Sequence, residues 1–228
     1  MIVTPALWRS PLQRATDRLG ARYVPAGDAA IAVAIGDEVA AVARAQALGY
    51  ADLSPLPRIG VKGAGATAFL GADGWRLPEA PNLAEMQHDG ATVARLGTED
   101  YLVYGAGGRV AGIAARWHAS VLARRGWLVP RRDGLAWIAL TGGHAPTLLS
   151  KLCAVDLRPA HFAPGAVAQT LVAKLSAVIV RGGVGADPRY DLFADSASAV
   201  YLWDCLADAA TEFGGRAIGC RALGIEPG

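Results

Sequence analysis

The alternation of apolar and polar positions predicts a pattern of strand, turn and helix that occurs twice in the chain. Residues 58–70 (RIGVKGAGATAFL) and 137–149 (WIALTGGHAPTLL) both begin like a half-buried strand and continue into an Ala/Leu segment of helical period. Gly63 and Gly142 occupy the turn in the two copies, where the lack of a Cβ lets the backbone reverse. We therefore interpret the two segments as an internal repeat.

Further strands and a second helix are predicted after each copy of the repeat. The helix at 197–213 has the clearest pattern, because apolar residues, Val200 among them, recur at steps of three and four. Asp195 or Ser196 is its expected N-cap, and the Gly-Gly pair at 214–215 is its expected stop. The other expected elements are strands at 91–96, 101–104, 167–171, 177–180 and 190–193 and a helix at 113–122.

Two strand–helix–strand–strand–helix units predict an α+β fold in which helices pack on one face of antiparallel sheets. A glycine-rich stretch at 105–112 suggests the boundary. We take residues 1–108 as the first unit and 109–228 as the second, with an approximate and potentially discontinuous division. Each half is small for independent stability, so we expect the two to share a core.

Composition and charge exclude several classes of function. The formal net charge of +2 does not favour nucleic acid as a partner. No stretch approaches the roughly 20 apolar residues of a membrane span, and the first residues lack the order of a signal peptide, so we expect a cytoplasmic protein without a membrane anchor. Neither a disulfide framework nor a metal site is expected, because the cysteines and histidines lack ligand spacing. These residues are Cys153, Cys205, Cys220, His88, His118, His144 and His161.

The segment 63–68 (GAGATA) matches the dinucleotide fingerprint G-x-G-x-x-A after a predicted strand. That fingerprint works in a parallel sheet whose next strand ends in an acidic residue about twenty positions later. Here the corresponding region, 78–82, is Pro-Glu-Ala-Pro-Asn, which is unsuited to a central strand. We therefore interpret the loop as structural, and a dinucleotide-dependent enzyme is the third alternative for this chain.

Segments along the whole chain resemble, in order and spacing, the first two domains of the glycine-cleavage aminomethyltransferases, which have a folate-binding fold. In the first half these are 10–12, 19–24, Glu38, 48–54, 58–63 and 96–103. The second half resembles more closely the gamma subunit of heterotetrameric sarcosine oxidase, at 152–158, Phe162, Gly165, 167–170, 178–181, 190–193, Ser198, 201–204 and 208–210. The resemblance implies an α+β fold of two related units.

The departures from that family bear on catalysis. The aminomethyltransferases have an acidic pair where this chain has Gly-Ala-Thr-Val-Ala-Arg at 90–95, and a carboxylate there would orient the reacting amine. The run at 223–228 resembles the family's L-R-x-E-x-G motif, whose glutamate recognises the pterin. Glu226 is retained and Gly224 replaces the arginine. We therefore expect no catalytic residue, and Glu226 is the candidate folate ligand.

A stretch rich in arginine and tryptophan, without any acidic residue, is the candidate partner interface. Arginine pairs with carboxylates and tryptophan anchors interfaces, whereas the alternative is a solvated face over two core tryptophans. The candidate residues are Arg116, Trp117, Arg124, Arg125, Trp127, Arg131 and Arg132.

The resemblance implies a non-catalytic gamma-type subunit of a complex that oxidatively demethylates sarcosine or a related secondary amine. Larger partner subunits would hold FAD, FMN and NAD, and tetrahydrofolate would accept the one-carbon unit. This chain would bind no cofactor tightly, and tetrahydrofolate is its one candidate ligand. The alternative is a stand-alone folate-binding protein or an aminomethyltransferase-like enzyme that uses tetrahydrofolate.

Overall fold

The computed structural model describes residues 7–182 and 188–227. The chain forms a five-stranded sheet of order β5-β6-β7-β4-β8, a six-stranded sheet of order β10-β11-β12-β9-β3-β13 and a two-stranded ribbon, β1-β2. The N-terminal elements are α1 (Gln13–Arg18), β1 (Ala21–Ala26), β2 (Ala29–Ile35) and α2 (Glu38–Ala47). No helix among the described residues is long and apolar enough to cross a membrane.

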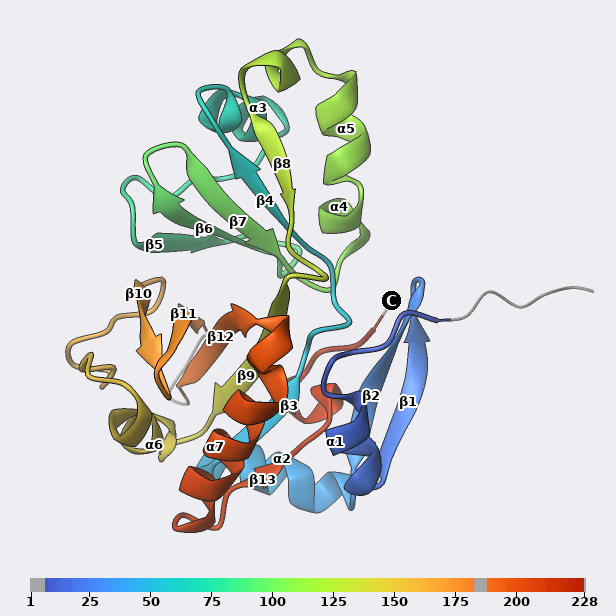
Figure 1. The fold of residues 1–228 in the computed structure, drawn as a ribbon, viewed down its shortest axis with the longest axis vertical. Coiled ribbons are helices and arrows are strands. Elements are labelled where there is room, and N and C mark those ends of the chain that lie inside the picture. Colours follow the sequence, from blue (N-terminus) through green and yellow to red (C-terminus); the bar gives the residue numbers. More distant parts are fainter. Residues whose placement is uncertain (1–6, 183–187, 228) are drawn as a thin grey trace, which may run out of the picture.

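The five-stranded sheet and its helices come from one continuous stretch of chain (Figure 1). Its elements are β4 (Arg58–Lys62), α3 (Ala66–Ala72), β5 (Leu83–Met86), β6 (Thr92–Gly97), β7 (Asp100–Tyr104), α4 (Gly108–Ala111), α5 (Ile113–Ala119), a 3₁₀ helix (Val121–Arg125) and β8 (Trp127–Pro130).

The six-stranded sheet draws on two separate parts of the chain. Its elements are β3 (Gly49–Asp52), β9 (Leu135–Thr141), α6 (Ala145–Leu152), β10 (Val167–Val172), β11 (Leu175–Gly182), β12 (Arg189–Asp195), a 3₁₀ helix (Ser196–Ser198), α7 (Ala199–Thr211) and β13 (Arg216–Ala217), followed by a 3₁₀ helix (Cys220–Leu223).

The internal repeat is confirmed in the strand order and in the turns. The sheets share the order β5-β6-β7-β4 and β10-β11-β12-β9, and in each the repeat supplies the fourth strand and the helix after it. Gly63 and Gly142 both have a φ of +104°, which L side chains rarely adopt. A Cβ on Gly142 would lie 2.6 Å from the carbonyl carbon of Ala47, so the turn requires glycine.

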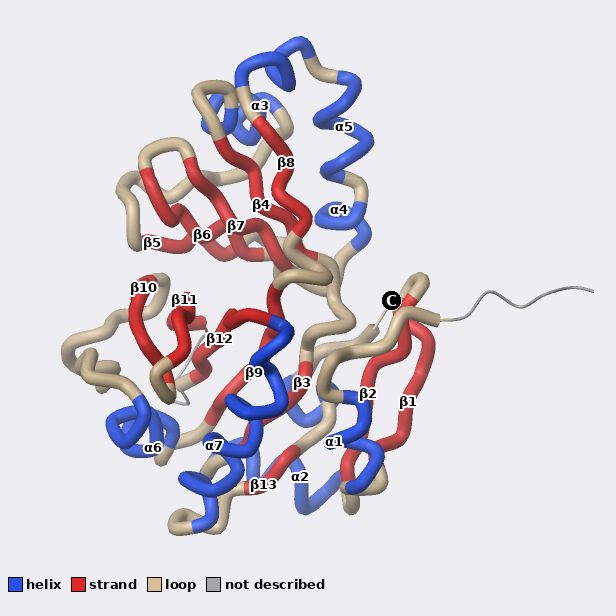
Figure 2. Tube along the Cα trace, viewed as in Figure 1, coloured by secondary structure: helices blue, strands red, loops and turns tan. Residues whose placement is uncertain are grey.

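The α+β prediction is confirmed, including the shared core. Helices cover the outer face of each sheet, and the inner faces pack against each other (Figure 2). Trp137 and Phe193 of the six-stranded sheet lie in one buried cluster with Leu102 and Tyr104 of the five-stranded sheet. The two units therefore bury a common apolar layer, as their small size predicts.

The predicted helix at 197–213 begins and ends close to the expected residues, with one error on its face. The Asp195 carboxylate accepts from the backbone N–H of Ala197, so Asp195 is the cap of the two candidates. Leu202, Trp203 and Leu206 are buried as predicted, but Val200 is 48% exposed. Val200 is the second residue of α7, and the buried face of that helix runs instead through Ala199, Leu202 and Leu206.

Strand pairing supports different limits for the two units. β3 precedes the first copy of the repeat but pairs with β9, whereas β8 follows residue 108 and pairs with β4. We propose residues 58–130 as the first unit, in place of a division at 108–109. The second unit is then discontinuous and consists of the described residues before 58 and after 130.

Arg58 joins the two connections that run between the units. Its guanidinium donates to the carbonyl oxygens of Ser54 (2.7 Å) and Leu56 (2.9 Å) on one connection, and to those of Arg132 (2.8 Å) and Leu135 on the other. Arg58 is only 4% exposed, and burial lowers its pKa to about 10. The buried guanidinium therefore links the two connections through hydrogen bonds from its own N–H groups.

Candidate functional site

The structure places Glu226 at a cavity on the seam between the two units. The cavity measures about 350 Å³, within the size range of small-molecule sites. The five-stranded sheet contributes Thr92 and Tyr104, and the six-stranded sheet contributes Trp137 and Asp191. The C-terminal segment closes one side, so Glu226 and Asp191 border the same space although they are distant in the sequence.

Asp191 is the centre of a buried polar network beside this cavity. Its carboxylate accepts from Trp137 Nε1 (2.9 Å), from Arg189 Nη2 (2.9 Å) and from the Tyr104 hydroxyl (3.4 Å). Burial, reinforced by the charge of Asp191, raises the pKa of Tyr104 well above its usual range, so the phenol remains a donor. The network links β7 of one unit to β9 and β12 of the other.

Glu226 is the accessible carboxylate of the seam cavity. Its side chain is 72% exposed and lies 3.3 Å from Arg221 Nε. It follows Gly224, whose φ of +70° ends the preceding 3₁₀ helix. An exposed carboxylate at the rim of a partly apolar cavity is suited to accept N–H donors of a heterocycle, as the pterin recognition implied by the resemblance requires. Its role in folate binding stays a prediction.

Asp89 also lines the seam cavity, and sequence reasoning missed it. It directly precedes the segment 90–95, which lacks the acidic pair that the resemblance implies there. One Asp89 oxygen accepts from the N–H of Ala91 (3.0 Å), and the other lies 3.8 Å from Arg109 Nη1. Three carboxylates therefore border the cavity, of which Asp191 is saturated by donors and the other two each face an arginine.

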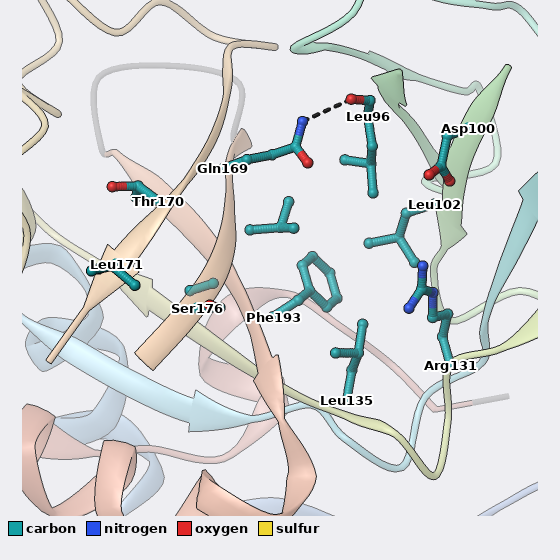
Figure 3. Close-up of a pocket in the computed structure, with 12 residues that line it drawn as sticks. Leu96, Asp100, Leu102, Arg131, Leu135, Gln169, Thr170, Leu171, Ser176 and Phe193 are labelled. Carbon is teal, nitrogen blue, oxygen red and sulfur yellow. Dashed lines mark hydrogen bonds between the residues drawn. The ribbon is translucent and has the colours of Figure 1, made fainter. Parts of the chain in front are cut away.

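A second cleft separates the facing sheets at the other end of the seam (Figure 3). Its volume is about 580 Å³, and its floor is apolar, with Leu102, Leu135 and Phe193. Gln169 Nε2 donates to the carbonyl oxygen of Leu96 (2.7 Å) and ties the two units together at its rim. Arg131 extends along the wall beside Leu102. The cleft is thus mainly apolar, with one cation, Arg131, and one carboxylate, Asp100, in its lining.

The arginine- and tryptophan-rich stretch does not form one continuous face. Trp117 is buried and packs edge-on against Phe69, with ring centroids 4.7 Å apart. Arg116 Nε lies 2.8 Å from the Asp73 carboxylate. Trp117 is therefore a core tryptophan and Arg116 makes a local ion pair, and partner binding at these two residues stays a prediction.

The other members of the stretch lie on the surface near β8. Trp127 is 69% exposed, and Arg125 is also exposed. Arg132 Nη1 pairs with Asp28 at 2.7 Å, whereas Arg131 makes no ion pair or hydrogen bond with the described side chains. The side chain of Arg124 lies outside the described part of the structure. Partner binding at Arg125, Trp127 and Arg131 stays a prediction.

A groove runs between α5 and β8, and we call it the β8 groove. It has a volume of about 680 Å³. Its lining is mainly apolar and includes three arginines but no carboxylate. Its lining includes Trp117, His118, Trp127, Leu128, Arg131 and Arg132.

The dinucleotide alternative is wrong, because the sheet and the loop both lack the required geometry. β4 pairs antiparallel with β7 and with β8, so it is not part of a parallel nucleotide-binding sheet. The N–H groups of Gly63 and Gly65 donate to the carbonyls of Glu99 and Arg125, and that of Thr67 donates to the Glu99 carboxylate. These donors are therefore not available to a pyrophosphate. Nor do the described residues contain a His/Cys/Asp/Glu cluster that could hold a metal ion.

Two repeated units with packed sheets and a cavity at their seam define an aminomethyltransferase-like folate-binding fold. The sequence profile described as GCVT N-terminal domain matches residues 83–226, and the chain belongs to this family. Over 143 residues the chain is 29% identical to an aminomethyltransferase of Saccharopolyspora erythraea, covering 61% of this chain and 38% of that protein.

Two solved structures share the fold. The glycine cleavage system aminomethyltransferase T from Bartonella henselae superposes with a TM-score of 0.73 at 16% identity, over 95% of this chain and 60% of that one. A chain of the heterotetrameric sarcosine oxidase from Corynebacterium sp. U-96, in complex with pyrrole 2-carboxylate, superposes with a TM-score of 0.68 at 20% identity. The superposition covers 90% of this chain and 96% of that one. The chain thus spans less than two thirds of either aminomethyltransferase that it matches.

Proposed function

We propose that this chain is a cytoplasmic, non-catalytic gamma-type subunit of a complex that oxidatively demethylates sarcosine or a related secondary amine. The partner subunits would hold FAD, FMN and NAD, and tetrahydrofolate would accept the one-carbon unit. The observation that carries the proposal is an exposed aromatic residue, Trp127, beside unpaired Arg131 on a chain whose fold is shared with part of a heterotetrameric sarcosine oxidase. Exposed tryptophan with arginine is typical of interface anchors.

The buried carboxylate of the seam cavity is suited to a binding or scaffolding role rather than to proton transfer. A general base needs a carboxylate that is not already engaged by donors. Asp191, the buried carboxylate of the cavity, already accepts from Trp137, Arg189 and Tyr104. The network instead links β7 of one sheet to β9 and β12 of the other. We therefore assign this chain to support of the complex, and the chemistry to its partners.

Co-purification of the tagged chain from its native host tests this function. We expect larger subunits with flavin absorbance to elute with it in fixed stoichiometry, and the complex, but not the isolated chain, to oxidise sarcosine or another secondary amine. A full-length chain that elutes from the host alone, or that turns over an amine by itself, would contradict the proposal.

Glu226 favours a second candidate, a stand-alone folate-binding protein or aminomethyltransferase-like enzyme. Its exposed carboxylate at the rim of the seam cavity is free to meet a ligand. If this function holds, Glu226→Ala weakens tetrahydrofolate binding about ten- to a hundredfold in a titration of the isolated chain, because a charge-assisted hydrogen bond is lost. The matched variant Glu212→Ala, on the surface at the end of α7, should bind normally. Equal affinities of the two variants, or no binding, would remove this candidate.

A further inference from the structure

The outer edge of β8 is open, in contrast to the same position in the other sheet. β8 is the last strand of its sheet and pairs with β4 from Lys62–Trp127 to Ile59–Pro130. In the six-stranded sheet, β3 lies at the equivalent position beside β9, and β13 covers its outer edge. Within the described residues, no strand covers β8. Its outward N–H and C=O groups are thus available to another chain.

The space beside this edge has the dimensions and lining for an added strand. The β8 groove, about 680 Å³, is lined by residues of β8 and α5. Figure 1 shows α5 on the side of β8 that faces away from β4. Trp117 and Leu128 give it an apolar floor, and Trp127 is 69% exposed at its end. A strand pairs at a spacing of about 4.8 Å, and alternate side chains then enter such a groove.

The charges around the groove select the chemistry of the occupant. Residues 109–132 contain no aspartate or glutamate, and no carboxylate lines the groove. Arg132 is compensated by Asp28, whereas Arg131, which also lines the inter-sheet cleft with Asp100, makes no ion pair with a described side chain. His118 is a further nitrogen-bearing side chain of the groove. A second copy of this chain would bring like charges together, because an antiparallel β8–β8 pair centred on Trp127–Pro130 places Arg132 of each copy opposite Arg125 of the other. The surface therefore complements an acidic strand.

We propose that the β8 edge accepts an extended, acidic segment of a partner subunit as a sixth strand of the sheet. This inference rests on the proposed function and names the contact through which the complex forms. Main-chain hydrogen bonds to Trp127–Pro130 hold the segment, the Trp127 ring packs on its apolar side chains, and the Arg131 guanidinium pairs with one of its carboxylates. Pro130 lacks an N–H and limits the added ladder to its first residues.

Amide hydrogen exchange tests the added strand directly. The probe for the isolated chain is a capped peptide of alternating valine and glutamate, and the matched control replaces glutamate with lysine. We expect the amides of residues 127–129 to exchange at least tenfold more slowly with the glutamate peptide or in the co-purified complex, and not with the lysine peptide. Trp127→Ala and Arg131→Glu should each weaken association about tenfold or more. Tyr201→Ala and Arg18→Glu, exposed residues on other elements, are the matched controls.

The outcomes separate this inference from the proposed function. Protection of β8 by the glutamate peptide without any co-purified flavin subunit would support the strand site and contradict the oxidase role. A flavin complex that forms with β8 unprotected and tolerates Trp127→Ala would support the oxidase role and overturn the strand site. Failure of both the peptide and the complex to protect β8 would overturn it as well. Thermal unfolding of each variant near that of the parent chain confirms that the comparison involves folded protein.

Discussion

Replacing Arg58 with methionine is expected to lower the free energy of unfolding by about 4 kcal/mol, in the range for breaking a buried charged cluster. Methionine keeps much of the apolar stem but removes every donor. The carbonyls of Ser54, Leu56, Arg132 and Leu135 would then lose their common partner in a buried setting. Urea unfolding measures the loss.

The same substitution should make stability depend more steeply on pH. Burial raises the pKa of Asp52, while hydrogen bonds from Ser10 and Ser54 and the charge of Arg58 oppose that rise. Without the cation, the folded-state pKa of Asp52 rises further above its unfolded value. The folded state then holds the proton more tightly, so stability is greatest below the unfolded pKa of about 4 and falls as pH rises through the folded value. The deficit of Arg58→Met should therefore be smaller at acidic pH.

Two further variants show whether the loss comes from the hydrogen bonds of Arg58 to the two connections or from removal of any arginine. Arg58→Lys keeps a charge but not the planar fork that reaches both connections, so it should recover only part of the lost stability. Arg22→Met removes an exposed partner of Glu38 and should change stability little. A loss below about 1 kcal/mol for Arg58→Met would contradict the proposed role of Arg58, because even one buried carbonyl left without a donor costs that much.

The fold was predictable where local geometry decides it. Gly63 and Gly142 mark a turn that only glycine accommodates, and the alternation before each of them identifies a strand. The sheets to which β3 and β8 belong were not predictable. Both strands have only four residues, and their partners, β9 and β4, are set by packing far along the chain. The proposed unit limits differ from 108–109 for this reason.

The candidate site shows the same division between local and distant information. Glu226 was found through a motif that it shares with a known family. Asp191 and Tyr104 meet across the seam although they are 87 residues apart in the sequence, so no local pattern predicts their contact. In the arginine- and tryptophan-rich stretch, the period changes from helix to 3₁₀ turn to strand between Trp117 and Trp127. One tryptophan is buried and the other exposed, which a single periodicity does not distinguish.

Asp191→Asn is expected to lower the free energy of unfolding by about 3 kcal/mol, the second largest effect. Asparagine is close to isosteric, but the substitution removes the charge that compensates Arg189, whose side chain is only 22% exposed. Its NH₂ group would also face one of the donors, Trp137 Nε1 or the Tyr104 hydroxyl, instead of accepting from it. Urea unfolding, with near-ultraviolet circular dichroism to follow Trp137, measures both consequences.

A double variant shows whether the lost charge balance is the cause. Arg189→Met combined with Asp191→Asn removes both charges, so it should be more stable than Asp191→Asn alone, although each removes a native group. Asp28→Asn, at a carboxylate that is 78% exposed, should change little. If the double variant were the less stable one, Asp191 would act mainly through Trp137 and Tyr104. The seam would then depend on the hydrogen bonds between the sheets rather than on a compensated charge.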